Sequence, residues 1–246
     1  MRLSSLILGS LVAVMWYALP MSAPAETPAA EFEKGNHEFA DRNFKDAIAS
    51  YESVVKSGEW SANLFYNLAN AYYRERDVGR AILNYERALR IDPHHPEAQA
   101  NLRLTREETH ALELSPSPAT RFLDVVNPSV LAIAVASLFW AAFILLIWRI
   151  RTANVVAAIC CLIACAICAL GIYSIEHGIR GATGAIVVQD NLEARVATAD
   201  SAQSILALPA GSEVLVLQPR GDWSYVVLPT NRRGWVSAKA IARIWL

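Results

Sequence analysis

Two uncharged, strongly apolar stretches occupy the middle of this 246-residue chain, and they limit how the rest can fold. They cover residues 129–148 and 155–173 and are separated only by residues 149–154. A helix of about 20 residues, rising about 1.5 Å per residue, spans the hydrocarbon core of a bilayer. A central arginine in such a helix costs on the order of 3 kcal/mol, so Arg149 and Arg151 should stay in the headgroups of the cytoplasmic face. The sequence therefore predicts a transmembrane helical hairpin over 128–175, with both flanking parts on the same side of the membrane.

The first 25 residues are organised like an export signal. Arg2 precedes an apolar run over 6–19, and the small residues Ala23 and Ala25 form a cleavage pattern before Glu26. We therefore predict a signal peptide over 1–25. The alternative is an uncleaved anchor helix, for which the apolar run is short. Either interpretation exports the chain from Glu26 onward, which places the hairpin in a bacterial inner membrane and both flanking parts in the periplasm.

Composition agrees with a membrane protein that carries two exported domains. The chain is 54% hydrophobic and 18% charged, and its formal net charge is −1. Nucleic-acid binding usually requires a basic patch or stripe, so this class of partner is not expected. The predicted domains are 26–114 and 185–246, joined to the hairpin by linkers over 115–127 and 176–184. Each is long enough for one small domain.

All four cysteines lie in the second apolar stretch: Cys160, Cys161, Cys165 and Cys168. Cysteine behaves there as a small hydrophobic residue, and small residues allow two helices to approach closely in lipid. The alternative is a membrane thiol-redox protein that uses Cys165 and Cys168. The exported parts contain no cysteine, so disulfides cannot stabilise them.

An internal repeat with a period of 34 residues occupies the first exported part. The pattern aligns the pairs Asn36 and Asn70, Phe39 and Tyr73, Ala47 and Ala81, Ile48 and Ile82, and Tyr51 and Tyr85. It resembles the tetratricopeptide repeat, a helix-turn-helix unit, with copies at about 28–61 and 62–95. The second copy matches the family pattern well, whereas in the first copy Glu31, Glu38 and Glu59 replace residues that the family usually has. The resemblance implies an all-α domain.

The repeats should be followed by a capping helix over 96–112. Pro93 stops the preceding helix, and Ala98, Leu102 and Thr105 form part of a weakly apolar face that can cover the stack. Stacked repeats usually need about three units to bury a continuous core. We therefore expect this domain to gain stability from a partner protein, from self-association or from the membrane surface.

The resemblance also implies a groove lined by the first helix of each unit. Its predicted protein-binding residues are Asn36, Phe39, Tyr66, Asn67, Asn70, Tyr73 and Arg74, with Phe32, Asn63, Glu97 and Asn101 at neighbouring groove positions. Asparagine can pair with the backbone of an extended peptide, and aromatic rings add apolar contact. The alternative for Tyr66 and Tyr73 is a purely structural place in the core.

The expected ligand of this groove is an internal peptide segment or a protein surface. Members of the family that bind a C-terminal carboxylate have cations where this chain has Phe32, Glu97 and Asn101. Without those cations the carboxylate would lose its charge-assisted hydrogen bonds.

After residue 184 the pattern changes to short β-type runs with Gly, Pro and Asn turns, which predicts a small all-β barrel. Residues 208–211, 221–226 and 234–237 resemble the bacterial SH3 domain family, whose members bind proteins or cell wall. The candidate ligand surface is Trp223, Tyr225 and Trp235. The alternative is that these rings fill the core, as tryptophan commonly does in a barrel this small.

The sequence contains no recognisable catalytic motif. No phosphate-binding glycine loop, zinc signature or nucleophile motif is present, and the histidines are scattered. We predict no catalytic residue, no metal site and no cofactor, and therefore a protein that is not an enzyme.

The order of signal, repeats, hairpin and SH3-like domain resembles the BatE-like proteins of the Bat aerotolerance operon group. The resemblance implies a noncatalytic inner-membrane scaffold working beside von Willebrand factor A domain proteins and a MoxR-type ATPase. The alternative is a cell-wall accessory protein whose SH3 domain binds peptidoglycan and whose repeats recruit a wall enzyme.

Overall fold

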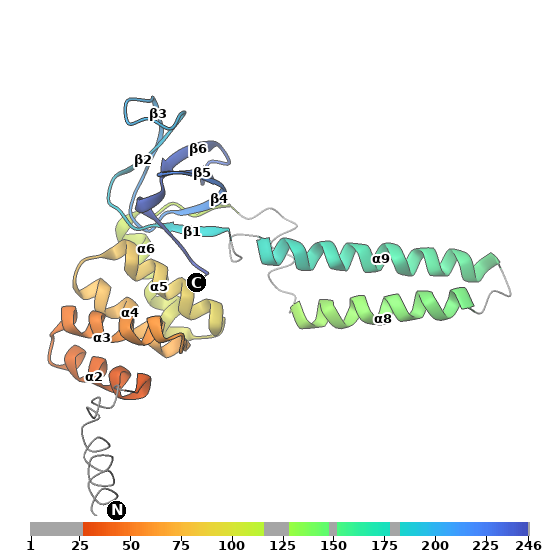
Figure 1. The fold of residues 1–246 in the computed structure, drawn as a ribbon, viewed down its shortest axis with the longest axis horizontal. Coiled ribbons are helices and arrows are strands. Elements are labelled where there is room, and N and C mark those ends of the chain that lie inside the picture. The colour runs from red at the N-terminus through yellow and green to blue at the C-terminus, as the bar shows by residue number, and fades with distance from the viewer. Residues whose placement is uncertain (1–26, 116–127, 148–151, 178–182, 246) are drawn as a thin grey trace, which may run out of the picture.

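The computed structural model describes residues 27–115, 128–147, 152–177 and 183–245 (Figure 1). The predicted signal peptide, nearly all of the first linker, and Arg149 and Arg151 lie outside the described residues.

Five helices form the N-terminal stack, in which each helix packs against the next. They are α2 (Pro28–Ala40), α3 (Phe44–Ser57), α4 (Ala62–Arg74), α5 (Val78–Ile91) and α6 (Pro96–Thr109). Thr27 and Ser61 cap the first helix of each pair by accepting a backbone N–H of the first turn, at 3.2 and 3.1 Å. Arg42 and Arg76 occupy the same place in successive turns, both with a positive φ, 63° and 67°. The 34-residue sequence repeat is therefore also a repeat of backbone conformation.

Small residues and tyrosines build the core of the stack, in agreement with the sequence pattern. Ala47 and Ala81 are fully buried, and Tyr51 and Tyr85 are each only 1% exposed. Gly35 lies directly against a tyrosine: an added Cβ would come within 2.7 Å of the Tyr51 ring. The absence of a side chain at Gly35 lets α2 approach α3 closely enough to cover that ring.

Two apolar helices, α8 (Pro128–Ile147) and α9 (Thr152–His177), run antiparallel and project from one side of the molecule (Figure 1). Of the described helices, one is long and apolar enough to cross a membrane, over Val155–Tyr173. The apolar part of α8, Ser129–Leu145, is shorter.

Three of the four cysteines of α9 are partly shielded from solvent. Cys161, Cys165 and Cys168 are partly buried, and the Cys165 thiol lies 3.6 Å from the Val135 carbonyl oxygen of α8. Cys160 is exposed on the other face. This arrangement fits the interpretation of the cysteines as small residues at a helix contact.

The C-terminal part forms a seven-stranded antiparallel sheet with the order β3-β2-β6-β5-β4-β1-β7. The strands are β1 (Gly184–Val187), β2 (Leu192–Arg195), β3 (Ser204–Leu208), β4 (Glu213–Arg220), β5 (Trp223–Val227), β6 (Arg233–Ser237) and β7 (Ile241–Arg243), with a 3-10 turn η1 (Ala238–Ala240) before the last. The sheet encloses its own apolar core, in which Val214, Val226 and Val236 are completely buried. We call this part the β domain.

Two expected boundaries shift. The capping helix ends at Thr109 instead of residue 112, because His110 adopts a left-handed conformation with φ of 52°. The second linker, expected over 176–184, is shorter, because α9 continues to His177 and β1 begins at Gly184.

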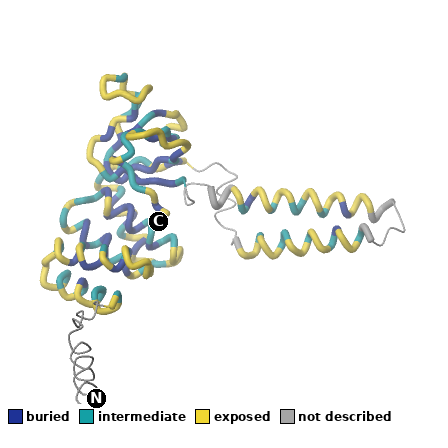
Figure 2. The backbone as a smooth tube through the Cα atoms, viewed as in Figure 1, coloured by how far each residue is buried: buried dark blue, intermediate teal, exposed yellow. Residues whose placement is uncertain are grey.

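The helical stack and the β domain pack against each other and share a core. Ile186 of β1 and Ile244 near the C-terminus are 0 and 4% exposed and belong to the apolar cluster of the repeats. At Gly79 of α5, an added Cβ would lie 2.8 Å from the Val187 carbonyl oxygen, so the backbones of α5 and β1 are in direct contact. Figure 2 shows buried segments continuing from the helices into the sheet.

Hydrogen bonds also join the two parts. The Arg87 guanidinium donates to the carbonyl oxygens of Ile244 and Arg243 at 3.2 and 3.0 Å. The residues after α6 run alongside the start of β4, where the Glu213 N–H donates to the Leu112 carbonyl oxygen at 2.8 Å. The segment that leaves the repeats is thus fixed to the β domain before the chain reaches the hairpin.

A buried charge cluster completes this contact. Arg106 of α6, whose side chain is 13% exposed, binds Glu213 of β4 and lies 2.7 Å from Glu86 and 3.7 Å from Glu113. Glu213 also accepts the Leu114 N–H at 3.0 Å. Burial raises the pKa of the Glu213 carboxyl to about 7, although the charge of Arg106 opposes this shift.

The structure shows a source of stability for the short repeat stack that the sequence did not lead us to expect. We expected a partner protein, self-association or the membrane surface, but the β domain of the same chain covers α5 and α6. Burying one isoleucine side chain stabilises a fold by about 1.5–3 kcal/mol, and Ile186 and Ile244 both contribute in this way. The sequence pattern could not reveal this, because the two parts are separated by the hairpin.

Candidate protein-binding groove

The first helix of each pair and the capping helix line a groove on the repeat stack. Its central pocket has a volume of about 370 Å³. The pocket is lined by Phe39, Tyr66, Asn70, Tyr73, Arg74, Tyr85, Asn101, Leu104 and Thr105. The contacts with the β domain involve α5 and other residues of α6, so this pocket stays open.

Asparagine side chains meet in pairs across neighbouring helices of the groove. In the first pair, the Asn67 amide of α4 donates to Asn36 Oδ1 of α2 at 3.0 Å. The Tyr51 hydroxyl donates to the same oxygen at 2.8 Å. Burial raises the pKa of Tyr51 to about 12, so its phenol stays protonated and acts as the donor.

The same arrangement recurs one repeat later. Asn101 of α6 donates to Asn70 Oδ1 of α4 at 3.1 Å, and the Tyr85 hydroxyl donates to that oxygen at 2.6 Å. Burial raises the pKa of Tyr85 as well. Because each member lies 34 residues after its counterpart, the groove presents two equivalent polar positions, which we call the asparagine pairs.

The second asparagine pair leaves two amide atoms available to a ligand. In the second pair, Asn70 uses its oxygen and Asn101 its amide nitrogen, and within the described residues neither the Asn70 Nδ2 nor the Asn101 Oδ1 has a hydrogen-bond partner. One donor and one acceptor side by side match the N–H and C=O that a single peptide residue exposes. In the first pair the Asn36 Nδ2 donates to Glu33 at 3.4 Å, so the second pair is the one that leaves both atoms open.

Aromatic rings form the apolar part of the groove. Tyr66 lies between the Tyr85 ring, at 6.2 Å, and the His95 ring, at 4.9 Å. Tyr66 and Tyr73 are partly exposed. They pack against the core and still present one face to the groove.

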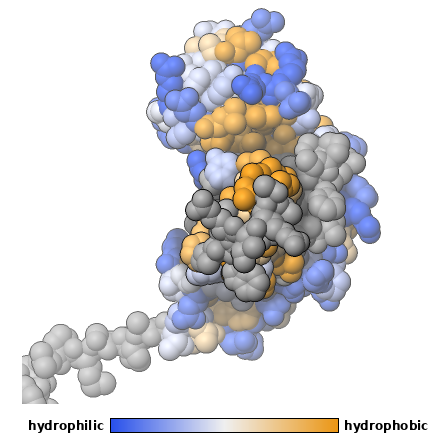
Figure 3. Space-filling view, turned by 90° about the vertical axis from the view of Figure 1, so that its right-hand side faces the viewer, coloured by the Kyte–Doolittle hydropathy of each residue, from blue (hydrophilic) through white to orange (hydrophobic). Residues whose placement is uncertain are grey.

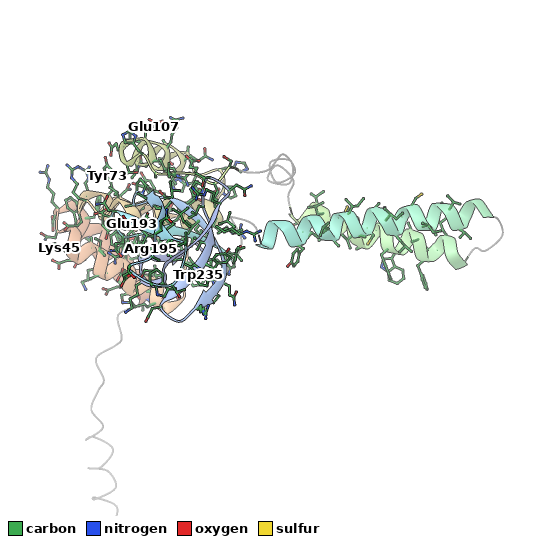
Figure 4. The ribbon with its side chains drawn as sticks, turned by 90° about the horizontal axis from the view of Figure 1, so that it is seen from above. Lys45, Tyr73, Glu107, Glu193, Arg195 and Trp235 are labelled. Atoms are coloured by element: carbon green, nitrogen blue, oxygen red, sulfur yellow. The ribbon has the colours of Figure 1, made fainter. Side chains whose placement is uncertain are left out.

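A tyrosine and a glutamate close one end of the groove between α4 and α6. The Tyr73 hydroxyl donates to the two Glu108 carboxylate oxygens at 2.8 and 3.1 Å. This hydrogen bond is the main reason why the pKa of Tyr73 is raised. Arg74, the next residue, is exposed and lines the pocket. Figure 4 shows Tyr73 on the helical side of the molecule.

The structure brings five predicted residues together around the pocket and places two beside it. Phe39, Tyr66, Asn70, Tyr73 and Arg74 line the pocket. Asn36 and Asn67 form the neighbouring asparagine pair.

Sequence reasoning missed Tyr85, Leu104 and Thr105 as lining residues. Leu104 and Thr105 lie one turn after Asn101, so the helical period of α6 was the signal that could have found them.

A second hollow, of about 400 Å³, lies at the start of the stack and is lined by Pro28, Glu31, Ser53, Val54 and Ser57. It contains none of the residues that the repeat pattern predicts for protein binding. We therefore take the groove with the asparagine pairs as the candidate site.

The second predicted surface, in the β domain, lies outside the core. Trp223, Tyr225 and Trp235 are partly exposed, whereas their strand neighbours Ser224, Val226 and Val236 are buried. The alternative of tryptophans in the core is therefore wrong. Aliphatic residues fill the interior of this sheet, and the alternation of side chains along β5 and β6 turns the large rings outward.

Comparisons with known proteins identify the repeat part of the chain. A family model of the tetratricopeptide repeat matches residues 32–96. Sperm-associated antigen 1 of Rattus norvegicus is 30% identical over 108 residues, and that of Mus musculus is 31% identical over 107. Each match covers 39% of this chain and 12% of the relative, so the chain spans about an eighth of the length of these curated relatives. The similarity thus concerns the repeats, which suggest a scaffold for protein–protein interaction.

Proposed function

We propose that this protein is a noncatalytic scaffold of a bacterial inner membrane that binds an extended segment of a partner protein in its repeat groove. The observation that carries the proposal is the second asparagine pair, with one donor and one acceptor open beside Tyr66, Tyr73 and Leu104. Such a surface can pair with a peptide backbone and bury its apolar side chains at the same time.

The packing of the repeats on the β domain supports a hairpin that crosses the membrane twice. The two parts precede and follow the hairpin in the chain, and the shared core with Ile186 and Ile244 forms only if both lie on the same side. An odd number of crossings would separate them. If α9 spans the bilayer, α8 must span it too. The residues that flank the shorter apolar part of α8 would then supply the rest of the length that a crossing needs.

We expect both ends of the chain to be accessible from the periplasm. A protease-sensitive tag inserted after Glu26 and another after Leu246 should both be cut in spheroplasts, because the same-side contact requires it. A tag between Arg149 and Arg151 should be cut only after the membrane is opened. Cleavage of one terminal tag alone would contradict the hairpin and the scaffold arrangement together.

The partners that we propose follow from the resemblance of the domain order to the Bat group. They are membrane proteins with a von Willebrand factor A domain and a MoxR-type ATPase system.

A groove substitution should separate binding from folding. Leu104 is 51% exposed and lines the pocket, so Leu104→Ser should leave the fold intact and weaken partner binding by roughly tenfold, the loss of one buried leucine contact. The measurement is photo-crosslinking from position 74 in intact membranes, with the captured protein identified by mass spectrometry.

The matched control is Ile91→Ser. Ile91 is 47% exposed at the end of α5 and does not line the pocket, so this variant should capture the partner at the level of the unmodified chain. Equal capture by the Leu104 and Ile91 variants would rule out the groove as the binding site.

A further inference from the structure

The outer face of strands β4, β5 and β6 carries a cluster of aromatic rings. Tyr225 pairs with Trp235 in the register of β5 and β6, and their ring centroids are 4.9 Å apart. Trp223 and Gln218 extend this face onto the β4–β5 ribbon, where Gln218 pairs with Tyr225. The guanidinium of Arg220 lies over the Trp235 ring at 6.0 Å. We call this surface, defined by Gln218, Arg220, Trp223, Tyr225 and Trp235, the aromatic face.

The strand register places one end of the aromatic face, at the β4–β5 turn, beyond the start of β1. Gly184, the first residue of β1, pairs antiparallel with Leu215, and the Val216 N–H donates to the Thr183 carbonyl oxygen at 2.8 Å. Beyond Val216, β4 therefore continues past the first residue of β1. The β4–β5 turn at Gly221 lies at that end of the molecule.

The distance to the hairpin is limited by the chain itself. The six steps from His177 at the end of α9 to Thr183 can span at most about 20 Å. Figure 1 shows β4 and β5 on the side of the β domain from which α8 and α9 project. Figure 4, seen from above, shows Trp235 on the hairpin side and Lys45 on the opposite side. Figure 3, which looks from the hairpin side, shows hydrophobic residues of the β domain next to the hairpin.

The charges around the aromatic face are mostly positive. At the end of the ribbon with the Gly221 turn, the exposed charged side chains are those of Arg220, Asp222 and Lys239, two cations and one carboxylate. Arg232 and Arg233 lie at the other end of β5. Leu217, at a bulge of the same ribbon, is 45% exposed. Tryptophan and tyrosine with flanking cations are the residues that proteins place at the headgroup level of a bilayer, and each cation near an anionic surface adds about 1 kcal/mol.

We propose that the aromatic face rests on the headgroups of the membrane that the hairpin crosses, and that it favours anionic phospholipid. This inference rests on the proposed membrane position of the hairpin. Contact at the aromatic face, added to the hairpin, would fix the orientation of the joined repeats and β domain above the bilayer. The groove would then face its partner at a defined height and angle.

Site-specific photo-crosslinking to lipid tests the proposal on the full chain in nanodiscs. A benzophenone amino acid replaces Gln218 on the aromatic face, Asp200 in the exposed β2–β3 turn, or Phe143 on α8, which is 47% exposed. We expect lipid adducts at 218 and 143 and none above background at 200. Adding phosphatidylglycerol to phosphatidylcholine should raise the yield at 218, and Arg220→Ser with Lys239→Ser should reduce that preference by roughly tenfold.

The three positions separate the possible failures. Adducts at 143 without adducts at 218 would overturn the lipid contact and leave the proposed scaffold function standing. Absence of adducts at both positions would overturn the membrane hairpin as well. A third outcome would assign the aromatic face to peptidoglycan and refute the proposal. In that outcome the full chain is retained on purified sacculi, a Trp235→Ala variant is not retained, and position 218 gives no lipid adduct.

Discussion

Replacing Arg106 by Met should lower the free energy of unfolding by about 3–5 kcal/mol at pH 8, because the buried carboxylates of Glu86 and Glu213 would lose their shared cation. For a chain of this size that change lowers the midpoint of thermal unfolding by roughly 10 °C. The measurement is a thermal melt of the full chain in detergent, followed by circular dichroism. Because Arg106 joins α6 to β4, limited proteolysis should also cut more readily between the repeats and the hairpin.

Arg103→Met is the matched control for this prediction. Arg103 lies on the same helix and is exposed, so its replacement should change the midpoint by no more than a surface substitution does. An Arg106 variant that melts and is proteolysed like the Arg103 variant would show that the charge cluster does not hold the repeats and the β domain together.

Replacing Glu213 by Gln should remove a pH dependence of stability between about pH 4.5 and 7. The ordinary pKa of a glutamate is 4.5, and burial raises that of Glu213 to about 7 in the folded chain. Between these values the folded chain retains a proton that the unfolded chain has released. The free energy of unfolding therefore falls as pH rises through this window, by on the order of 3 kcal/mol from this group, and levels off above it.

The glutamine variant mimics the protonated carboxyl and should keep its stability across the window. At pH 8 it should be more stable than the unmodified chain, and at pH 4.5 the two should be similar. The measurement is denaturant unfolding of the full chain at a series of pH values. Glu113→Gln is the control, because Glu113 binds the same arginine from an exposed position. This variant should keep the fall of the unfolding free energy between about pH 4.5 and 7. If the unfolding free energy of the Glu213→Gln variant fell with pH as steeply as that of the unmodified chain, the pH dependence would belong to other groups.

The substitutions at Arg106 and Glu213 test the contact between the repeat stack and the β domain. α6 carries Asn101 and Leu104 on the groove and Arg106 toward the β domain. Loosening the contact should therefore also weaken the groove, because the second asparagine pair depends on the position of α6.

The sequence by itself determined the features whose signal is local or periodic. The 34-residue period predicted the helical repeats, because the same small and aromatic residues recur wherever two helices must pack. Short β-type runs with turn residues predicted an all-β C-terminal part, and uncharged stretches predicted the paired apolar helices. It also named the asparagines and aromatics of the groove, since the family pattern assigns them to the first helix of each unit.

Only the tertiary structure decided what those elements do to one another. Asn36 and Asn70 each accept hydrogen bonds from a tyrosine and from a second asparagine, and the second pair leaves one donor and one acceptor for a ligand. The alternation of β5 and β6 turned Trp223 and Trp235 outward, where composition had favoured the core. The bare backbone of Gly79 and the isoleucines Ile186 and Ile244 joined the repeats to the β domain. Such contacts carry no periodic signal, because they form between surfaces that the hairpin separates in the chain and that meet only when shape, burial and charge fit in three dimensions.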